Sequence, residues 1–249
     1  CEAVQSTAVA QALRHLGVRV LTGRALSRCA GAAPSDALAS MLHVSKDGAK
    51  PDGGVERLPA DLVLVCTGRV ANSRLAYEAG LPVGGGGAVR VRVPGGASVA
   101  DPRVFALGGV AETPLPEALR AYAEPTYRPL ASNGACQAWL CAEAMWAAAW
   151  RDGATDPVPE GDWGFWHERV GACAVGGVGF APHELRQWRV PAETALLTAD
   201  GGDPSYLQLV LEPGGGRLLG AQALGPGDGG ATQALLAWLH AALRAEWSL

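Results

Sequence analysis

The chain has 249 residues, of which 49% are hydrophobic, and its formal net charge is -4 at pH 7. This length and balance predict a globular protein with one large domain or two modest ones, and they exclude a disordered tail. The 20 basic residues form no dense cluster among the 24 acidic ones, so nucleic acid is not expected as a partner.

The cysteine usage predicts a reducing, intracellular compartment such as the cytoplasm or an organelle matrix or stroma. The six cysteines are scattered without a C-x-x-C pair, whereas a secreted disulfide scaffold is shorter and denser in cysteine. No charged-then-apolar signal segment stands at Cys1, where the residues already favour a helix. The five histidines lack metal-ligand spacing, so no metal site is expected.

The first elements alternate between helix and strand. Residues 1–16 favour a helix that ends at Gly17, and residues 18–21 favour a short strand. Residues 48–54 carry three glycines and predict a hairpin tip or a surface insertion. Residues 61–66 form a continuous apolar run, which is typical of a strand buried on both faces in a parallel sheet.

The middle of the chain is rich in turns. Residues 75–79 predict a short helix that ends at Gly80, and the glycines of residues 84–87 predict a loop. A phosphate-binding loop is disfavoured there because no helix follows it. Residues 89–93 alternate like a half-exposed strand, and residues 103–107 predict an apolar strand that leads into Gly108 and Gly109.

A long apolar helix is predicted over residues 130–150. Asn133, Gln137 and Glu143 interrupt its apolar surface, so a buried helix is favoured over a membrane span. The segment of residues 151–161 is rich in Pro, Gly and Asp and marks a domain boundary.

The last part of the chain predicts an antiparallel sheet with helices on one face, which is an α+β arrangement. Its clearest signal is a hairpin, in which two alternating strands flank the turn of residues 213–216. The predicted strands cover residues 172–175, 206–212 and 217–224, and the predicted helices cover residues 182–188 and 231–246.

The order of these segments resembles the C-terminal half of the pyridine nucleotide-disulfide oxidoreductase superfamily, and within it the NADH oxidases and CoA-disulfide reductases. Residues 58–69 with Asn72 are similar to the segment that returns the chain from the NAD domain to the flavin domain. Residues 101–111 resemble the second flavin motif, and residues 129–131 resemble the start of the helix that faces the flavin ring. Residues 175–185 and 207–225 resemble the dimerisation domain.

This resemblance implies an α/β nucleotide-binding region with incomplete NAD and FAD domains, followed by an α+β dimerisation domain. Residues 1–68 would complete an NAD(P)-binding domain, residues 69–150 would close an FAD-binding domain, and residues 151–249 would form the dimerisation domain. The implied cofactor is FAD, and the implied substrate is NAD(P)H. The implied binding residues are Gly108 and Gly109 under the flavin, Leu130 and Ala131 at the helix start, and Gly68 on the nicotinamide side.

The sequence departs from the family pattern at the places that bind the cofactor. Gly109 stands where the family has an Asp that accepts hydrogen bonds from the ribityl hydroxyls, and Ala71 stands where Pro is usual. Both G-x-G-x-x-G fingerprints are absent. Two hypotheses therefore remain open: a portion of an FAD-dependent NAD(P)H oxidoreductase with an unidentified acceptor, or a non-catalytic remnant that serves as a dimerisation module. The partner is expected to be a second copy of the chain or the missing N-terminal half.

Other residues carry weaker signals. Cys136 and Cys141 have the C-x4-C spacing of a redox disulfide, but residues five apart on a helix point about 140° from each other and are poorly placed to bridge. His240 is expected to be a packing residue. Trp139, Trp146 and Trp150 recur along one predicted helix and are expected to pack in the core or at an interface. No catalytic side chain is predicted, because the cofactor supplies the chemistry of hydride transfer.

Overall fold

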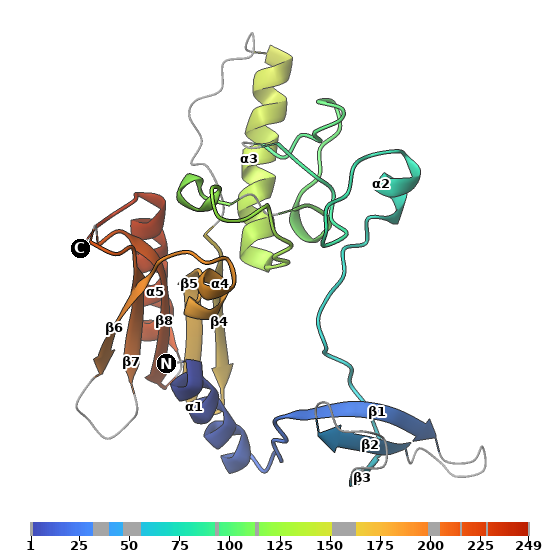
Figure 1. Cartoon of the computed structure of the whole chain (residues 1–249), viewed down its shortest axis with the longest axis vertical. Helices are drawn as coiled ribbons and strands as arrows, with labels where there is room; N and C mark the ends of the chain where they lie inside the picture. Colours follow the sequence, from blue (N-terminus) through green and yellow to red (C-terminus); the bar gives the residue numbers. More distant parts are fainter. Residues whose placement is uncertain are drawn as a thin grey trace. The chain divides into compact units, whose positions relative to one another are not determined.

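The computed structural model of the chain describes residues 2–31, 40–46, 56–92, 95–112, 115–150, 163–198, 205–214, 216–227 and 229–248 (Figure 1). The chain forms two compact units. The smaller unit comprises Leu13–Gly68, and the larger one comprises Cys1–Ala12 together with Arg69–Leu249. Each unit has its own sheet.

The sheet of the smaller unit is an antiparallel meander in the order β1-β2-β3. The strands are β1 (Arg24–Gly31), β2 (Ser40–Lys46) and β3 (Glu56–Ala60). An exposed ion pair between Arg19 and Glu56 links the start of this unit to the last strand. The hairpin tip predicted at residues 48–54 lies outside the described residues.

Two predicted strands of the smaller unit are wrong. Residues 18–21 form no strand, and residues 61–66 are irregular and follow the end of β3. Leu62 is 75% exposed and Leu64 is 78% exposed, so the apolar run is not buried. A strand needs a neighbour for its backbone hydrogen bonds and a cover for its apolar faces. Within the described part of this unit, the meander ends at Ala60 and provides neither.

The helices predicted from hydrophobic periodicity are confirmed. Helix α1 covers Glu2–His15, and α2 covers Arg74–Glu78. Helix α3 covers Ala131–Trp150, α4 covers Pro182–Gln187, and α5 covers Gly230–Arg244. Two short 3-10 turns precede α3: η1 (Gly108–Val110) and η2 (Glu117–Leu119). None of the helices in the described ranges is both long enough and apolar enough to cross a bilayer.

The larger unit is built on a five-stranded antiparallel sheet in the order β4-β5-β8-β7-β6. The strands are β4 (Phe165–Val170), β5 (Cys173–Gly179), β6 (Glu193–Thr198), β7 (Tyr206–Leu211) and β8 (Leu218–Pro226). The predicted hairpin of β7 and β8 is confirmed, with Leu207 paired to Ala223. Strands β4 and β6 were not predicted. They form the two edges, where most side chains are solvated and the apolar pattern is weak.

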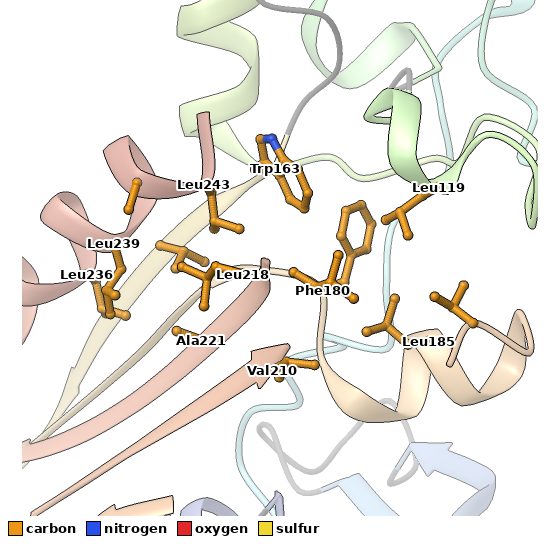
Figure 2. Packing of buried hydrophobic residues seen from close by; sticks show 14 of the residues in the cluster. Leu119, Trp163, Phe180, Leu185, Val210, Leu218, Ala221, Leu236, Leu239 and Leu243 are labelled. Carbon is orange, nitrogen blue, oxygen red and sulfur yellow. The ribbon is translucent and has the colours of Figure 1, made fainter. Parts of the chain in front are cut away.

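Helix α5 covers one face of this sheet through Leu236, Leu239 and Leu243 (Figure 2). The helix lies close to β5, because a Cβ atom on Gly176 would clash with the Leu236 side chain and lie 2.7 Å from the Trp166 carbonyl oxygen. Phe180 follows β5 and packs edge-on against Trp163, with the ring centroids 5.9 Å apart. The core of the larger unit therefore lies between the sheet, α5 and α4.

Helix α1 contributes to the other cluster of this sheet. Ala8 and Val9 pack against Val175, Tyr206 and Leu224. The side-chain amide of Gln5 donates to the carbonyl oxygen of Ala223 at 3.2 Å. The first half of α1 is therefore part of the larger unit, although its residues are far from the sheet in sequence.

The region between α2 and α3 is more irregular than the sequence predicts. The strands predicted at residues 89–93 and 103–107 appear only as isolated bridges, such as Val89 with Ala111 and Ala97 with Phe105. The prediction of regular strands here is wrong among the described residues. Short extended segments broken by turns offer too few consecutive pairs to form a ladder. The loop predicted at residues 84–87 is confirmed as a turn.

Candidate functional site

The turn at Gly108 meets the first turns of α3. The amide of Gly108 donates to Oε1 of Gln137 at 2.6 Å. A Cβ atom on Gly134 would lie 3.4 Å from the Cα atom of Gly108, so the two backbones are in contact. Gly108 has φ = +65°, a conformation that side-chain-bearing residues rarely adopt. Gly108 and the two α3 residues, Gly134 and Gln137, belong to different segments of the sequence, and the fold brings them into contact.

Gly109 has open space around the position of a Cβ atom, whereas Gly108 lies against Gly134. No atom lies within 4 Å of a Cβ atom built on Gly109, and the residue does not have a positive φ. Its carbonyl oxygen accepts a hydrogen bond from the Tyr127 hydroxyl at 3.1 Å. The position therefore has room for the Asp side chain of the family motif.

Leu130 and Ala131 form the entrance to α3. The Leu130 carbonyl accepts the first helical hydrogen bond, from the Gly134 amide at 3.2 Å. The amides of the first turn have no acceptor within a helix, so this end carries a partial positive charge and favours a negatively charged group. The hydroxyl of Ser132 donates to the Phe165 carbonyl at 2.6 Å, which ties the first turn of α3 to β4.

The structure therefore brings four of the five predicted binding residues to one region of the larger unit. They are Gly108, Gly109, Leu130 and Ala131. Gly68, the fifth, ends the smaller unit, and a Cβ atom built there would meet nothing within 4 Å. Tyr127 and Gln137 were missed as site residues. Gln137 had a detectable signal, as a polar residue in an apolar helix.

A buried carboxylate lies close to the Gly108 turn in sequence. Glu112 is 6% exposed, and its Oε2 lies 3.6 Å from Nε of Arg90. Burial raises the pKa of Glu112 above its ordinary value, and the positive charge of Arg90 opposes that rise. Arg90 also lies 3.8 Å from Glu124. Glu112, Arg120 and Glu124 line a cavity of about 220 Å³ together with apolar side chains.

The other residues with weak signals show no catalytic arrangement. Cys141 is buried with its sulfur 3.8 Å from that of Met145, and no disulfide joins it to Cys136. Burial raises the pKa of the Cys141 thiol. His240 packs beside Phe165, and its pKa is lowered, first by burial and then by Arg244. Within the described ranges, no group of three or more His, Cys, Asp or Glu side chains is placed to hold a metal ion.

The predicted core role of two tryptophans on α3 is wrong for this chain. Trp139 is 58% exposed and Trp146 is 61% exposed. The two residues lie seven apart, so they share one face of the helix. Within the described residues both side chains therefore stay more than half exposed, and packing at an interface is the part of the prediction that remains.

Solved structures share this fold. The NAD-dependent persulfide reductase of A. fulgidus matches with a TM-score of 0.75 and 22% identity, over 97% of this chain and 41% of its own. The reduced CoADR-RHD of Bacillus anthracis matches with a TM-score of 0.73 and 21% identity, over 96% of this chain and 39% of its own. The water-forming NADH oxidase of Lactobacillus brevis matches with a TM-score of 0.75 and 18% identity, over 99% of this chain and 50% of its own.

The chain thus spans half or less of the length of these three structures, and at such identities they establish the fold alone. No curated protein sequence matches the chain. The model of the pyridine nucleotide-disulphide oxidoreductase family matches residues 2–131, which is more than half of the chain. The match includes the Gly108 turn and the first residue of α3. The chain belongs to the pyridine nucleotide-disulphide oxidoreductase family.

Proposed function

We propose that the chain is the C-terminal portion of an FAD-dependent NAD(P)H oxidoreductase, in which hydride passes from NAD(P)H through the flavin to an acceptor. The observation that carries the proposal is the junction of Gly108 with α3, where the Gly108 amide meets Gln137 at 2.6 Å. Family membership suggests flavin-dependent hydride transfer, and we assign the flavin site to this junction. Residues 1–68 and 69–150 are assigned to incomplete NAD(P) and FAD domains, and residues 151–249 to a dimerisation domain.

The residues at the junction fit part of a flavin. The first-turn amides of α3 favour a negative charge, as expected at the pyrimidine edge of a reduced ring. Gly109 has open space but no carboxylate, so it offers no acceptor for a ribityl hydroxyl. The missing hydrogen bond to a charged group weakens binding by about 1.5–3 kcal/mol, which is more than about tenfold in affinity. When bound, the flavin carries the two electrons of the hydride.

Gly68 is assigned to the nicotinamide side on the strength of the family resemblance. It has no side chain, and open space surrounds the position of a Cβ atom. A backbone without a Cβ allows a planar ring to approach closely. Gly68→Val would fill this space and also strain the backbone, because Gly68 has φ = +117°. It is expected to weaken NAD(P)H binding without changing FAD binding, and titration with each nucleotide tests this.

The direct test of the oxidoreductase proposal is the visible spectrum of the purified chain with added FAD. A bound-flavin absorption band supports it, and a protein that stays colourless contradicts it for this chain.

Gly109→Asp is the companion variant, because a Cβ atom at this position meets no other atom and the new carboxylate restores the hydrogen-bond acceptor. It is expected to tighten FAD binding about tenfold. Gly85→Asp, at another open position, is the matched control and should leave FAD binding unchanged.

A second function rests on different observations. Gly109 lacks the carboxylate, and the apolar run at residues 61–66 exposes Leu62, Leu64 and Val65 to solvent. Exposed apolar side chains of this kind favour association with another chain. We therefore keep a non-catalytic assembly module, either a homodimer or a complex with the N-terminal half, as the alternative. A colourless chain that is dimeric by light scattering supports it, and a colourless monomer that binds no N-terminal half contradicts it.

A further inference from the structure

Arg128 stands two residues before Leu130, and its side chain reaches away from α3 into the C-terminal part of the larger unit. Its Nη2 donates to the Gly179 carbonyl oxygen at 2.9 Å. The guanidinium carbon lies 4.4 Å from the centroid of the Phe180 ring. Its Nε lies 3.9 Å from Oε1 of Glu184, and the side chain is 14% exposed. One residue of the helix entrance is therefore held at the end of β5 and the start of α4.

The surroundings of Arg128 are shaped to receive a guanidinium. A Cβ atom on Gly164 would lie 3.2 Å from both Nη1 and Nη2, so a side chain there would crowd the group. Glu184 is itself fixed, because its Oε2 accepts the amide of Ala181 at 2.8 Å at the start of α4. The hydrogen bond to Ala181 therefore holds the Glu184 carboxylate in place beside the guanidinium, independently of Arg128.

The backbone of Arg128 also sets the entrance of α3. Its carbonyl oxygen accepts the amide of Leu130 at 2.8 Å. The same oxygen accepts the side-chain amide of Asn133 at 3.4 Å, and Asn133 is only 2% exposed. The residue whose side chain is held by the sheet is therefore the residue that orders the first turn of the helix.

Charge explains why this position needs an arginine. A guanidinium that leaves water loses hydration, and its Nη1 finds no hydrogen-bond partner among the described residues. The carbonyl of Gly179, the ring of Phe180 and the carboxylate of Glu184 offset that loss together. A lysine ammonium is a point charge and cannot donate to a carbonyl, lie flat on a ring and face a carboxylate in the same geometry. An apolar side chain would do none of the three.

We propose that Arg128 is a positioning residue that locks the N-terminus of α3 to the C-terminal sheet. It does not touch the cofactor; it acts through the carbonyl that holds Leu130 and Asn133. The first-turn amides of α3 thereby keep one orientation relative to the Gly108 turn. The link to flavin binding rests on the proposed function, whereas the locking of the helix does not.

Hydrogen exchange of the full chain tests the locking without any flavin. In Arg128→Met, we expect the hydrogen-bonded amides within residues 130–136, such as those of Leu130 and Gly134, to exchange about tenfold faster, with the α5 core unchanged. Arg128→Lys should restore part of the protection, because it keeps one donor for Gly179. Arg103→Met is the control, because the side chain of Arg103 is 87% exposed and, among the described residues, pairs with its near neighbour Asp101 at 2.9 Å.

The experiments distinguish the locking of α3 by Arg128 from the proposed flavin-dependent function. Unchanged exchange at residues 130–136 in Arg128→Met overturns the proposal. If Arg128→Met does not fold, Arg128→Lys decides: faster exchange confined to residues 130–136 supports the proposal, and uniformly faster exchange overturns it. Where the parent chain binds FAD, we expect Arg128→Lys to bind it several-fold more weakly at a temperature at which both chains are fully folded. A parent chain that binds no FAD contradicts the proposed function and leaves the exchange test intact.

Discussion

The amide of Gly108 donates to the side-chain oxygen of Gln137 at 2.6 Å, across a separation of 29 residues. This bond joins a backbone turn to the second turn of α3, and the contact of Gly108 with Gly134 lies beside it. Together they determine how the Gly108 turn faces the helix entrance.

Gln137→Ala should destabilise the chain by about 1–2 kcal/mol, because the part-buried Gly108 amide would lose its acceptor. The measurement is the free energy of unfolding from a urea titration. Gln233→Ala, on the exposed side of α5, is the matched control and should change stability by less than about 0.5 kcal/mol. Equal effects of the two substitutions would show that the hydrogen bond contributes nothing.

Gly176→Ala should destabilise the larger unit by about 1–3 kcal/mol, because the new Cβ atom would lie 2.7 Å from the Trp166 carbonyl oxygen and clash with Leu236. The substitution forces apart α5 and the sheet, which form the main core. Thermal unfolding followed by circular dichroism measures the loss. Gly85→Ala introduces the same methyl group where nothing lies within 4 Å, and a similar loss there would argue against the packing of α5.

The unfolding free energy should fall as pH rises through the titration of Glu112. Burial raises the pKa of Glu112 in the folded state, so the folded chain binds this proton more tightly than the unfolded chain does. The contribution is fully present below the ordinary pKa of 4.5 and is lost as pH rises through the folded value. Glu112→Gln should flatten this part of the profile, which urea titrations from pH 4 upward would reveal.

Asp101 provides a control of opposite sign. Its hydrogen bond with Arg103 lowers the pKa of Asp101 to about 2, so its contribution is lost as pH falls below the ordinary value of 3.8. Asp101→Asn should therefore change the acidic end of the profile and leave the region above pH 4.5 as it is. A Glu112→Gln profile that is identical to that of the parent chain would contradict the burial of Glu112.

The thiols of Cys66 and Cys141 should differ in reactivity. Cys66 is exposed, whereas Cys141 is 3% exposed and burial raises its pKa, which disfavours the reactive thiolate. Iodoacetamide should label Cys66 at least about tenfold faster in the folded chain, as measured by mass spectrometry of peptides. In guanidinium chloride the two rates should converge. Equally fast labelling in the folded chain would contradict the packing of α3.

Local pattern alone determined the helices and the inner strands of the larger sheet, β5, β7 and β8, but none of the strands β1, β2 and β3 of the smaller sheet. The periodicity of residues 130–150 and the glycine after residues 1–16 predicted α3 and α1, because side chains three and four apart share a face and glycine ends a helix. The turn between β7 and β8 predicted their hairpin. The order of the motifs indicated the family. These features depend on residues that are close in sequence, so they can be read without the fold.

Only the tertiary structure decided how those elements are used. An apolar run such as residues 61–66 reads as a strand, but it becomes one only where a neighbouring strand supplies hydrogen bonds and cover. Edge strands β4 and β6 carry little apolar signal because solvent replaces one neighbour. The junction of Gly108 with Gln137 and the reach of Arg128 to Gly179 join residues 29 and 51 positions apart. No local pattern encodes such contacts, because they exist only once the chain has packed.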